Sequence, residues 1–84
     1  MYWDVVEVIA ESDYNLYVRF ADGMSGRVRV APEKMTGVLA PLLDERFFKK
    51  VFLDQGAVAW PGEINLAPDA MYEQIAKREI ERVD

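Results

Sequence analysis

The segment YNLYVRF, from Tyr14 to Phe20, constrains the fold more than any other part of the sequence. Its residues alternate between two faces, which is the two-residue period of a strand with one buried face. The face predicted to point into the core carries Tyr14, Leu16, Val18 and Phe20. The Asp22-Gly23 pair then predicts a tight turn, and the SGRVRV segment behind it predicts the second strand of a hairpin.

The pairing register of this hairpin follows from the need to keep one apolar face. A register whose paired residue numbers sum to 46 keeps buried side chains together, whereas a sum of 45 sets Val18 against Arg27. The predicted pairs are Leu16–Val30, Val18–Val28 and Phe20–Gly26, joined through Asp22, Gly23 and Met24. This register also places Arg19 directly opposite Arg27. Tyr17 then lies opposite Arg29.

The other face of the hairpin is a candidate recognition surface. It is predicted to carry Tyr17, Arg19, Arg27 and Arg29. Arginine offers forked donors that suit carboxylates or phosphates, so this face could bind a partner. Glu7 or Glu11 on the preceding strand could instead neutralise the arginines, because cross-strand ion pairs are ordinary on exposed sheet faces. We favour neutralisation.

The first strand, VVEVIA from Val5 to Ala10, adds apolar residues to the possible interaction surface. If Val6, Val8 and Ala10 face the core, then Trp3, Val5 and Ile9 face the other side and need cover. A helix of the same chain is the cover that we favour, and a second subunit or a partner is the alternative. The candidate partner-binding residues are therefore Trp3, Val5, Ile9, Tyr17, Arg19, Arg27 and Arg29.

The remaining segments complete an α+β pattern. The predicted elements are a short helix over Glu45–Lys50 with Asp44 as its N-cap, a hairpin over Val51–Trp60, a type II turn at Pro61-Gly62, a short strand at Ile64–Leu66 and an amphipathic helix over Asp69–Val83. The apolar seam of the last helix is formed by Tyr72, Ala76, Ile80 and Val83, with Met71 and Ile75 beside it. We predict one domain over residues 1–84. It has a mostly antiparallel sheet of about five short strands, one short middle helix and a C-terminal amphipathic helix.

The stretch WPGEINLAPDAMYEQI could be a site or only a turn leading into a helix. As a pocket it would be lined by Trp60, Glu63, Asn65, Asp69 and Tyr72. Turn and cap chemistry explains the same residues, because Pro-Gly turns the chain, short polar side chains cap helices and aromatic rings pack in cores. We favour this second interpretation.

Composition argues against several classes of function. The 84 residues include no cysteine and no histidine, so thiolate chemistry, the commonest general base and zinc sites built from those residues are excluded. No spacing of acids selects a catalytic pair. We therefore expect no enzyme, no catalytic residue, no cofactor and no metal site.

Charge and hydropathy narrow the partners. The net charge of −5 disfavours direct nucleic-acid binding and favours a basic partner. No apolar run approaches the roughly 20 residues that a membrane span needs, and the first residues carry acids where a signal peptide needs bases. We expect no membrane association and a cytoplasmic location.

Three segments carry a family resemblance. They are DYNLYVRFADG at residues 13–23, GVLAPLLD at 37–44 followed by a Phe pair, and AVAWPGEINLAPDAMYE at 57–73. Together they resemble the small bacterial domain-of-unknown-function family 2442, over essentially the whole chain. The resemblance implies a compact α+β domain with no established catalytic activity. It also implies a link to small toxin-like proteins, since some members resemble the antitoxin side of such pairs.

The expected function is thus a non-enzymatic protein-interaction domain, an antitoxin-like partner of a small bacterial toxin. Its partner would be a small basic protein or a second copy of the chain in a homodimer. One alternative is a standalone homo-oligomeric scaffold. Another is a transcription-associated or ligand-sensing module.

Overall fold

Two small antiparallel sheets and a long C-terminal helix make up the part of the chain that the structure describes. The computed structural model describes residues 1–81, with side chains described through Arg78. The first sheet has the order β1 (Val5–Ala10), β2 (Asn15–Phe20) and β3 (Ser25–Arg29), and the second has the order β4 (Phe52–Asp54), β5 (Ala57–Trp60) and β6 (Ile64–Leu66). The predicted α+β class is confirmed. The six strands are divided between two sheets, where about five strands in one sheet were expected.

The helices connect and cover the sheets. They are two 3₁₀ helices, η1 (Pro32–Lys34) and η2 (Gly37–Leu43), and two α-helices, α1 (Glu45–Phe48) and α2 (Pro68–Glu81). The N-cap prediction is confirmed, because the Arg46 amide donates to Asp44 Oδ1 at 2.9 Å. Helix α1 ends at Phe48, two residues earlier than predicted. Its last residue, Phe48, is buried, as expected of one of the two phenylalanines.

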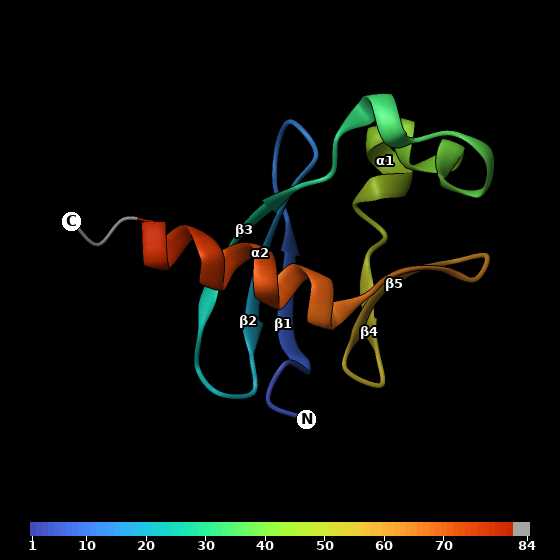
Figure 1. Ribbon diagram of the computed structural model, residues 1–84. Coiled ribbons are helices and arrows are strands. Elements are labelled where there is room, and N and C mark those ends of the chain that lie inside the picture. The colour runs from blue at the N-terminus through green and yellow to red at the C-terminus, as the bar shows by residue number, and fades with distance from the viewer. Residues whose placement is uncertain (82–84) are drawn as a thin grey trace.

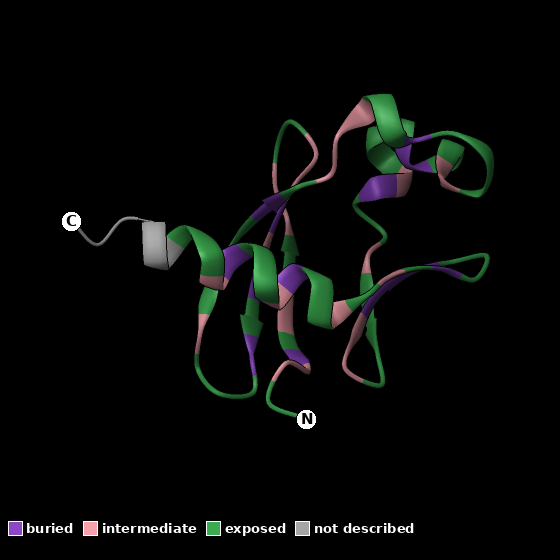
Figure 2. Ribbon diagram, viewed as in Figure 1, coloured by how far each residue is buried: buried purple, intermediate pink, exposed green. Residues whose placement is uncertain are grey.

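The core lies between α2, the first sheet and the second sheet. Helix α2 crosses the β1–β2–β3 sheet (Figure 1), and Figure 2 shows buried residues on both. The buried core residues include Leu16, Val18, Phe20 and Val28 from the first sheet, Val58, Trp60 and Ile64 from the second, and Met71 and Ile75 from α2. The buried seam of α2 therefore centres on Met71 and Ile75, whereas Tyr72 and Ala76 are only half-buried. Ile80 and Val83 of the predicted seam lie outside the described side chains.

The β2–β3 register differs from the prediction by two residues. The observed pairs sum to 44 and are Asn15–Arg29, Leu16–Val28, Tyr17–Arg27, Val18–Gly26 and Arg19–Ser25. The Phe20 amide donates to Met24 O at 2.8 Å, so the connection is Ala21-Asp22-Gly23 and Met24 is already paired. A shift of two residues keeps every side chain on its predicted face, because the strand period is two. The predicted Arg19–Arg27 opposition was wrong, and no two arginines face each other directly in the β2–β3 pairing.

A β-bulge in β1 overturns part of the predicted face assignment. The register of β1 against β2 shifts between Val5 and Glu7, which leaves Val6 as the extra residue and 44% exposed. Val5 is consequently turned into the core, where it is 2% exposed, so its assignment to the second face was wrong. Its amide donates to Gly56 O at 2.8 Å and joins the first sheet to the turn of the second.

The turns of the second sheet use left-handed backbone. Gln55 and Gly56 have φ of 52° and 83°, the sign that a two-residue type I′ hairpin requires at both central positions. Gly62 has φ of 90°, which agrees with the type II turn predicted at Pro61-Gly62. An L-residue in either glycine position would be strained.

Replacing Gly62 with alanine is expected to lower the free energy of unfolding by about 1–2 kcal/mol, which is the usual cost of left-handed backbone. No atom lies within 4 Å of a Cβ placed there, so strain alone acts. The matched variant Gly56→Ala should lower the free energy of unfolding by more than Gly62→Ala does, because its Cβ would also meet Asp4 Cγ at 2.8 Å. Urea unfolding of both variants measures the difference. A Gly62→Ala chain as stable as the wild type would contradict this turn.

Candidate functional site

One face of the first sheet is left open by the described part of the chain. We call it the outer face, and it is the face that points away from α2. Its side chains are Glu7 and Ile9 from β1 with Glu11 directly after it, Asn15, Tyr17 and Arg19 from β2, and Ser25, Arg27 and Arg29 from β3. The opposite face is covered, since a Cβ at Gly26 would lie 2.8 Å from Ile75 Cγ2 of α2. Ile9 accordingly remains 48% exposed.

Ion pairs connect the three arginines of the outer face to acids on β1 or in the turn that follows it. Arg19 Nε lies 3.1 Å from Glu7 Oε1, and Arg27 Nε lies 2.8 Å from Glu11 Oε1. Arg29 Nε lies 3.3 Å from Asp13 Oδ2, in the turn after β1. The pKa of Arg27 is raised above its ordinary value, first by its hydrogen bond to Glu11 and then by the charge of that carboxylate. The expected neutralisation by Glu7 and Glu11 is therefore observed.

A row of three side chains crosses the middle of the outer face. Ile9 pairs with Tyr17, and Tyr17 pairs with Arg27. The guanidinium carbon of Arg27 lies 5.5 Å from the centroid of the Tyr17 ring, within reach of a cation–π interaction. Because Arg27 on β3 also reaches Glu11 at the end of β1, its side chain extends across β2 and over this ring. An aliphatic, an aromatic and a guanidinium group thus form one continuous surface.

Five of the seven predicted partner-binding residues lie on this surface, namely Ile9, Tyr17, Arg19, Arg27 and Arg29. Val5 is in the core. Trp3 lies before β1, where its ring meets Tyr2 edge-on at 4.8 Å, and Tyr2 meets Tyr72 at 5.0 Å. Trp3 itself is half-buried.

Asp13 is a member of the ion-pair set that sequence reasoning missed. It has φ of 56°, and the next residue, Tyr14, has φ of 59°. The Asn15 amide donates to Ser12 O at 3.2 Å and closes this turn. Aspartate tolerates left-handed backbone better than most residues, so an aspartate in the loop between two strands was an available signal. The turn delivers its carboxylate to Arg29.

The stretch from Trp60 to Ile75 does not form the pocket considered above. Trp60 is 1% exposed, and its Nε1 donates to Phe48 O at 2.8 Å. Tyr72 instead donates its hydroxyl to Asp22 in the β2–β3 turn. Glu63, Asn65 and Asp69 are exposed. The aromatic residues of this stretch therefore hold the fold together, in agreement with the interpretation that we favoured.

The Tyr72–Asp22 hydrogen bond predicts a pH-dependent stability. This hydrogen bond is the largest of the effects that lower the pKa of Asp22 below 3.8, and the hydrogen bond from the Met24 amide is the second. A carboxyl whose pKa is lowered by folding stabilises the fold above its unfolded pKa, and this stabilisation is lost as pH falls through the folded pKa. We expect Tyr72→Phe to be less stable than the wild type at neutral pH, and the difference to shrink below pH 3.8.

The same hydrogen bond raises the pKa of Tyr72 above 10.0. The stability that this bond contributes is therefore also lost at high pH, as the pH rises through the raised pKa of Tyr72 and the hydroxyl loses its proton. Denaturant unfolding of both chains across the pH range measures the difference, and NMR titration follows the Asp22 carboxyl. A stability difference that stays constant from neutral to acid pH would contradict the role of this bond.

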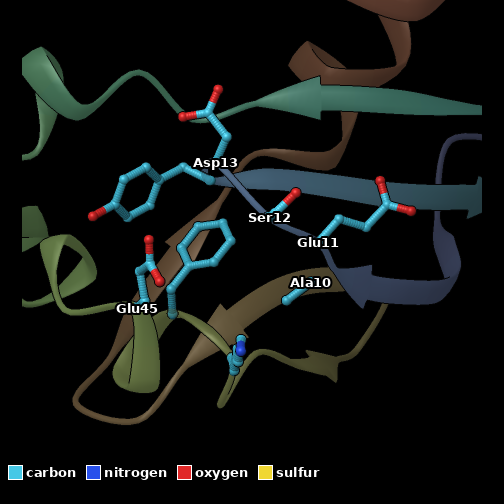
Figure 3. A pocket seen from close by; sticks show the side chains of 8 residues that line it. Ala10, Glu11, Ser12, Asp13 and Glu45 are labelled. Carbon is cyan, nitrogen blue, oxygen red and sulfur yellow. The ribbon is translucent and has the colours of Figure 1, made fainter.

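A hollow of about 230 Å³ with a mixed polar and apolar lining lies beside the β1–β2 turn. Its lining consists of Ala10, Glu11, Ser12, Asp13, Tyr14, Glu45, Phe48 and Lys49. Figure 3 shows the carboxylates of Glu11 and Asp13 turned away from that of Glu45. Because those two acids bind arginines of the outer face, the hollow does not assemble a pair of facing carboxylates.

An apolar hollow of about 270 Å³ lies between the end of β3 and the first turns of α2. Val28, Leu66 and Met71 are among its lining residues. Among the side chains that the structure describes, through Arg78, no three acids are close enough together to hold a metal ion. In the same part of the chain, no helix has the length and apolar character needed to cross a lipid bilayer.

Comparison with known families decides the relationship that the three sequence segments suggested. The model of the family described as "Protein of unknown function (DUF2442)" matches residues 5–77. The chain belongs to this family. The match to DUF2442 spans all six strands and most of α2, so it includes every residue of the outer face. No curated protein and no solved structure shows a significant match to the chain.

Proposed function

We propose that this DUF2442 chain is a non-enzymatic protein-interaction domain whose docking surface is the outer face. The observation that carries the proposal is the row of exposed Ile9, half-buried Tyr17 and exposed Arg27 on an open sheet face. Tyrosine and arginine are enriched in protein–protein interfaces, because each combines a large apolar body with polar groups that can still bond.

The ion pairs around this row suit it to binding. Each of the three arginines already has a carboxylate partner within its own chain. Arginines held in this way lose less side-chain freedom when a partner arrives, and that loss is one of the main costs of association. The outer face is thus partly preorganised.

The net charge favours a basic partner as a second candidate, in line with the antitoxin-like members that the chain resembles. On the outer face, three arginines balance Glu7, Glu11 and Asp13. The excess of acids therefore lies on other surfaces of the chain, where exposed residues such as Glu63, Asp69 and Glu73 would attract a basic protein. As part of the same proposal, we assign both roles to the cytoplasm. The chain contains no cysteine, and small secreted domains commonly depend on disulfides.

The proposal is tested by capture from the native lysate on immobilised chain, with the mass and stoichiometry of every bound species. Tyr17→Ala is expected to reduce the amount captured by about tenfold or more, as loss of an interface hot spot does. Val38→Ser is the matched control, because Val38 is 81% exposed on η2 and lies off the outer face. Equal capture by all three chains, or capture of neither a protein nor further copies of the chain, would contradict the proposal.

A further inference from the structure

We infer that Arg78 covers the free edge of β3 and protects it against strand addition by a second copy of the chain. In the described part of the chain, β3 is the last strand of the β1–β2–β3 sheet, so one of its edges has no strand beside it. Arg78 of α2 donates from Nη1 to Arg27 O on β3 at 2.6 Å. This inference concerns a different surface from the outer face and does not rest on the proposed function.

The hydrogen-bond pattern of the β2–β3 hairpin shows which backbone groups point to the free edge. The Phe20 amide donates to Met24 O, so the even-numbered residues of the hairpin form its hydrogen-bonded pairs. In an antiparallel pair, these alternate with pairs whose backbone groups point away from the partner strand. The outward groups of β3 are therefore the amides and carbonyls of Ser25, Arg27 and Arg29. They offer three donors and three acceptors to an added strand.

Two copies of this edge are complementary to each other. Antiparallel pairing would match Arg27 with its own counterpart and Ser25 with Arg29 of the other copy, so each outward donor meets an acceptor. Strand β3 contains no proline and its pairing shows no bulge, which are two common ways of spoiling an exposed edge. Like charges directly opposite disfavour the pairing, but Arg27 is already neutralised by Glu11. Protection of the edge therefore depends on a group from outside the sheet.

Arg78 is placed to give this protection. Its partner Arg27 O is the central acceptor of the edge, so a strand added in this register must displace the guanidinium and break a charge-assisted hydrogen bond. Helix α2 crosses β3 and runs past it (Figure 1). Gly26 allows this close approach, since a Cβ there would lie 2.8 Å from Ile75 Cγ2, and Ile75 lies one turn before Arg78 on α2.

Arg78→Met tests the protection, because methionine keeps an unbranched side chain and loses the donors. The hydrogen bond of a charged group opposes strand addition by about tenfold or more, so Arg78→Met should self-associate at about one-tenth or less of the concentration that the wild-type chain needs. Lys77→Met is the matched control, because it removes the same charge from the neighbouring exposed position and should associate as the wild type does. Sedimentation velocity measures the association, and circular dichroism melting confirms that each variant is folded.

Two further measurements show whether this association uses the β3 edge. In associated Arg78→Met, the amides of Ser25, Arg27 and Arg29 should exchange their hydrogens more slowly, because strand addition gives each of them an acceptor. Adding Ser25→Pro should reverse the association, because proline removes an outward donor and leaves the β2–β3 hydrogen bonds intact. The inference is overturned if Arg78→Met associates no more readily than Lys77→Met, if the three amides still exchange quickly in the associated chain, or if Ser25→Pro leaves the association unchanged.

Discussion

Replacing Trp60 with alanine is expected to lower the free energy of unfolding by about 3–5 kcal/mol, the usual cost of removing a large buried side chain. Trp60 is 1% exposed, and its ring centroid lies 5.6 Å from that of Phe48. Its Nε1 also donates to Phe48 O, which ties β5 to the end of α1. The expected loss of stability therefore has two causes, the cavity that the ring leaves and the Phe48 carbonyl that loses its hydrogen-bond donor.

Trp60→Phe separates these two contributions. Phenylalanine keeps most of the ring contact but has no donor, so the loss should fall to a smaller value that includes about 1–3 kcal/mol for the unpaired Phe48 carbonyl. Urea unfolding monitored by circular dichroism measures both variants. Equal losses in the two variants would mean that the hydrogen bond, and not the packing, dominates. A Trp60→Ala chain within 1 kcal/mol of the wild type would contradict the role of Trp60 in the core.

The second large effect is expected at Gly26, where β3 passes under α2. A Cβ at this position would lie 2.8 Å from Ile75 Cγ2 and 3.2 Å from Ile75 Cδ1. Gly26→Val should therefore push α2 away from the sheet and cost about 1–3 kcal/mol, as overpacking of a core does. Thermal unfolding measures the loss.

Two further chains make that test specific. Ser25→Val places the same side chain on the neighbouring, outward-facing position and should change stability by less than about 0.5 kcal/mol. In an Ile75→Ala background, Gly26→Val should cost less than in the wild type, because the space it needs has been vacated. If the stability losses of Gly26→Val and Ile75→Ala simply add in the double variant, the contact between Gly26 and Ile75 does not cause the loss seen in Gly26→Val.

Most of the secondary structure could be predicted from the sequence, because periodicity and turn residues act locally. The strand around Val18, the N-cap at Asp44 and the left-handed glycine at Gly62 all follow from such local rules. The division of the strands into two sheets could not be predicted in this way. It depends on contacts between residues far apart in the chain, such as the bond from the Val5 amide to Gly56 O.

Alternation fixes which face a side chain occupies but not which residue it meets. The β2–β3 hairpin shows this limit, since a two-residue shift preserves every face and still changes the partner of Arg27 from Arg19 to Tyr17. The bulge at Val6 shows another limit, because Val5 and Val6 are both valine and the sequence does not indicate which of them faces the core. For this reason the faces of the side chains were predicted correctly on β2 and β3 and wrongly at Val5.

The hydrogen bond between the Val5 amide and Gly56 O also has a consequence for how the chain folds. Each hairpin can form from local contacts, but this bond brings together segments from near the start and from the second half of the chain, so it forms only after a large loop has closed. Docking of the two hairpins is then a late, non-local event that couples them into one cooperative unit. In native-state hydrogen exchange, the Val5 amide would open with the domain as a whole and would report on the moment at which the two halves separate.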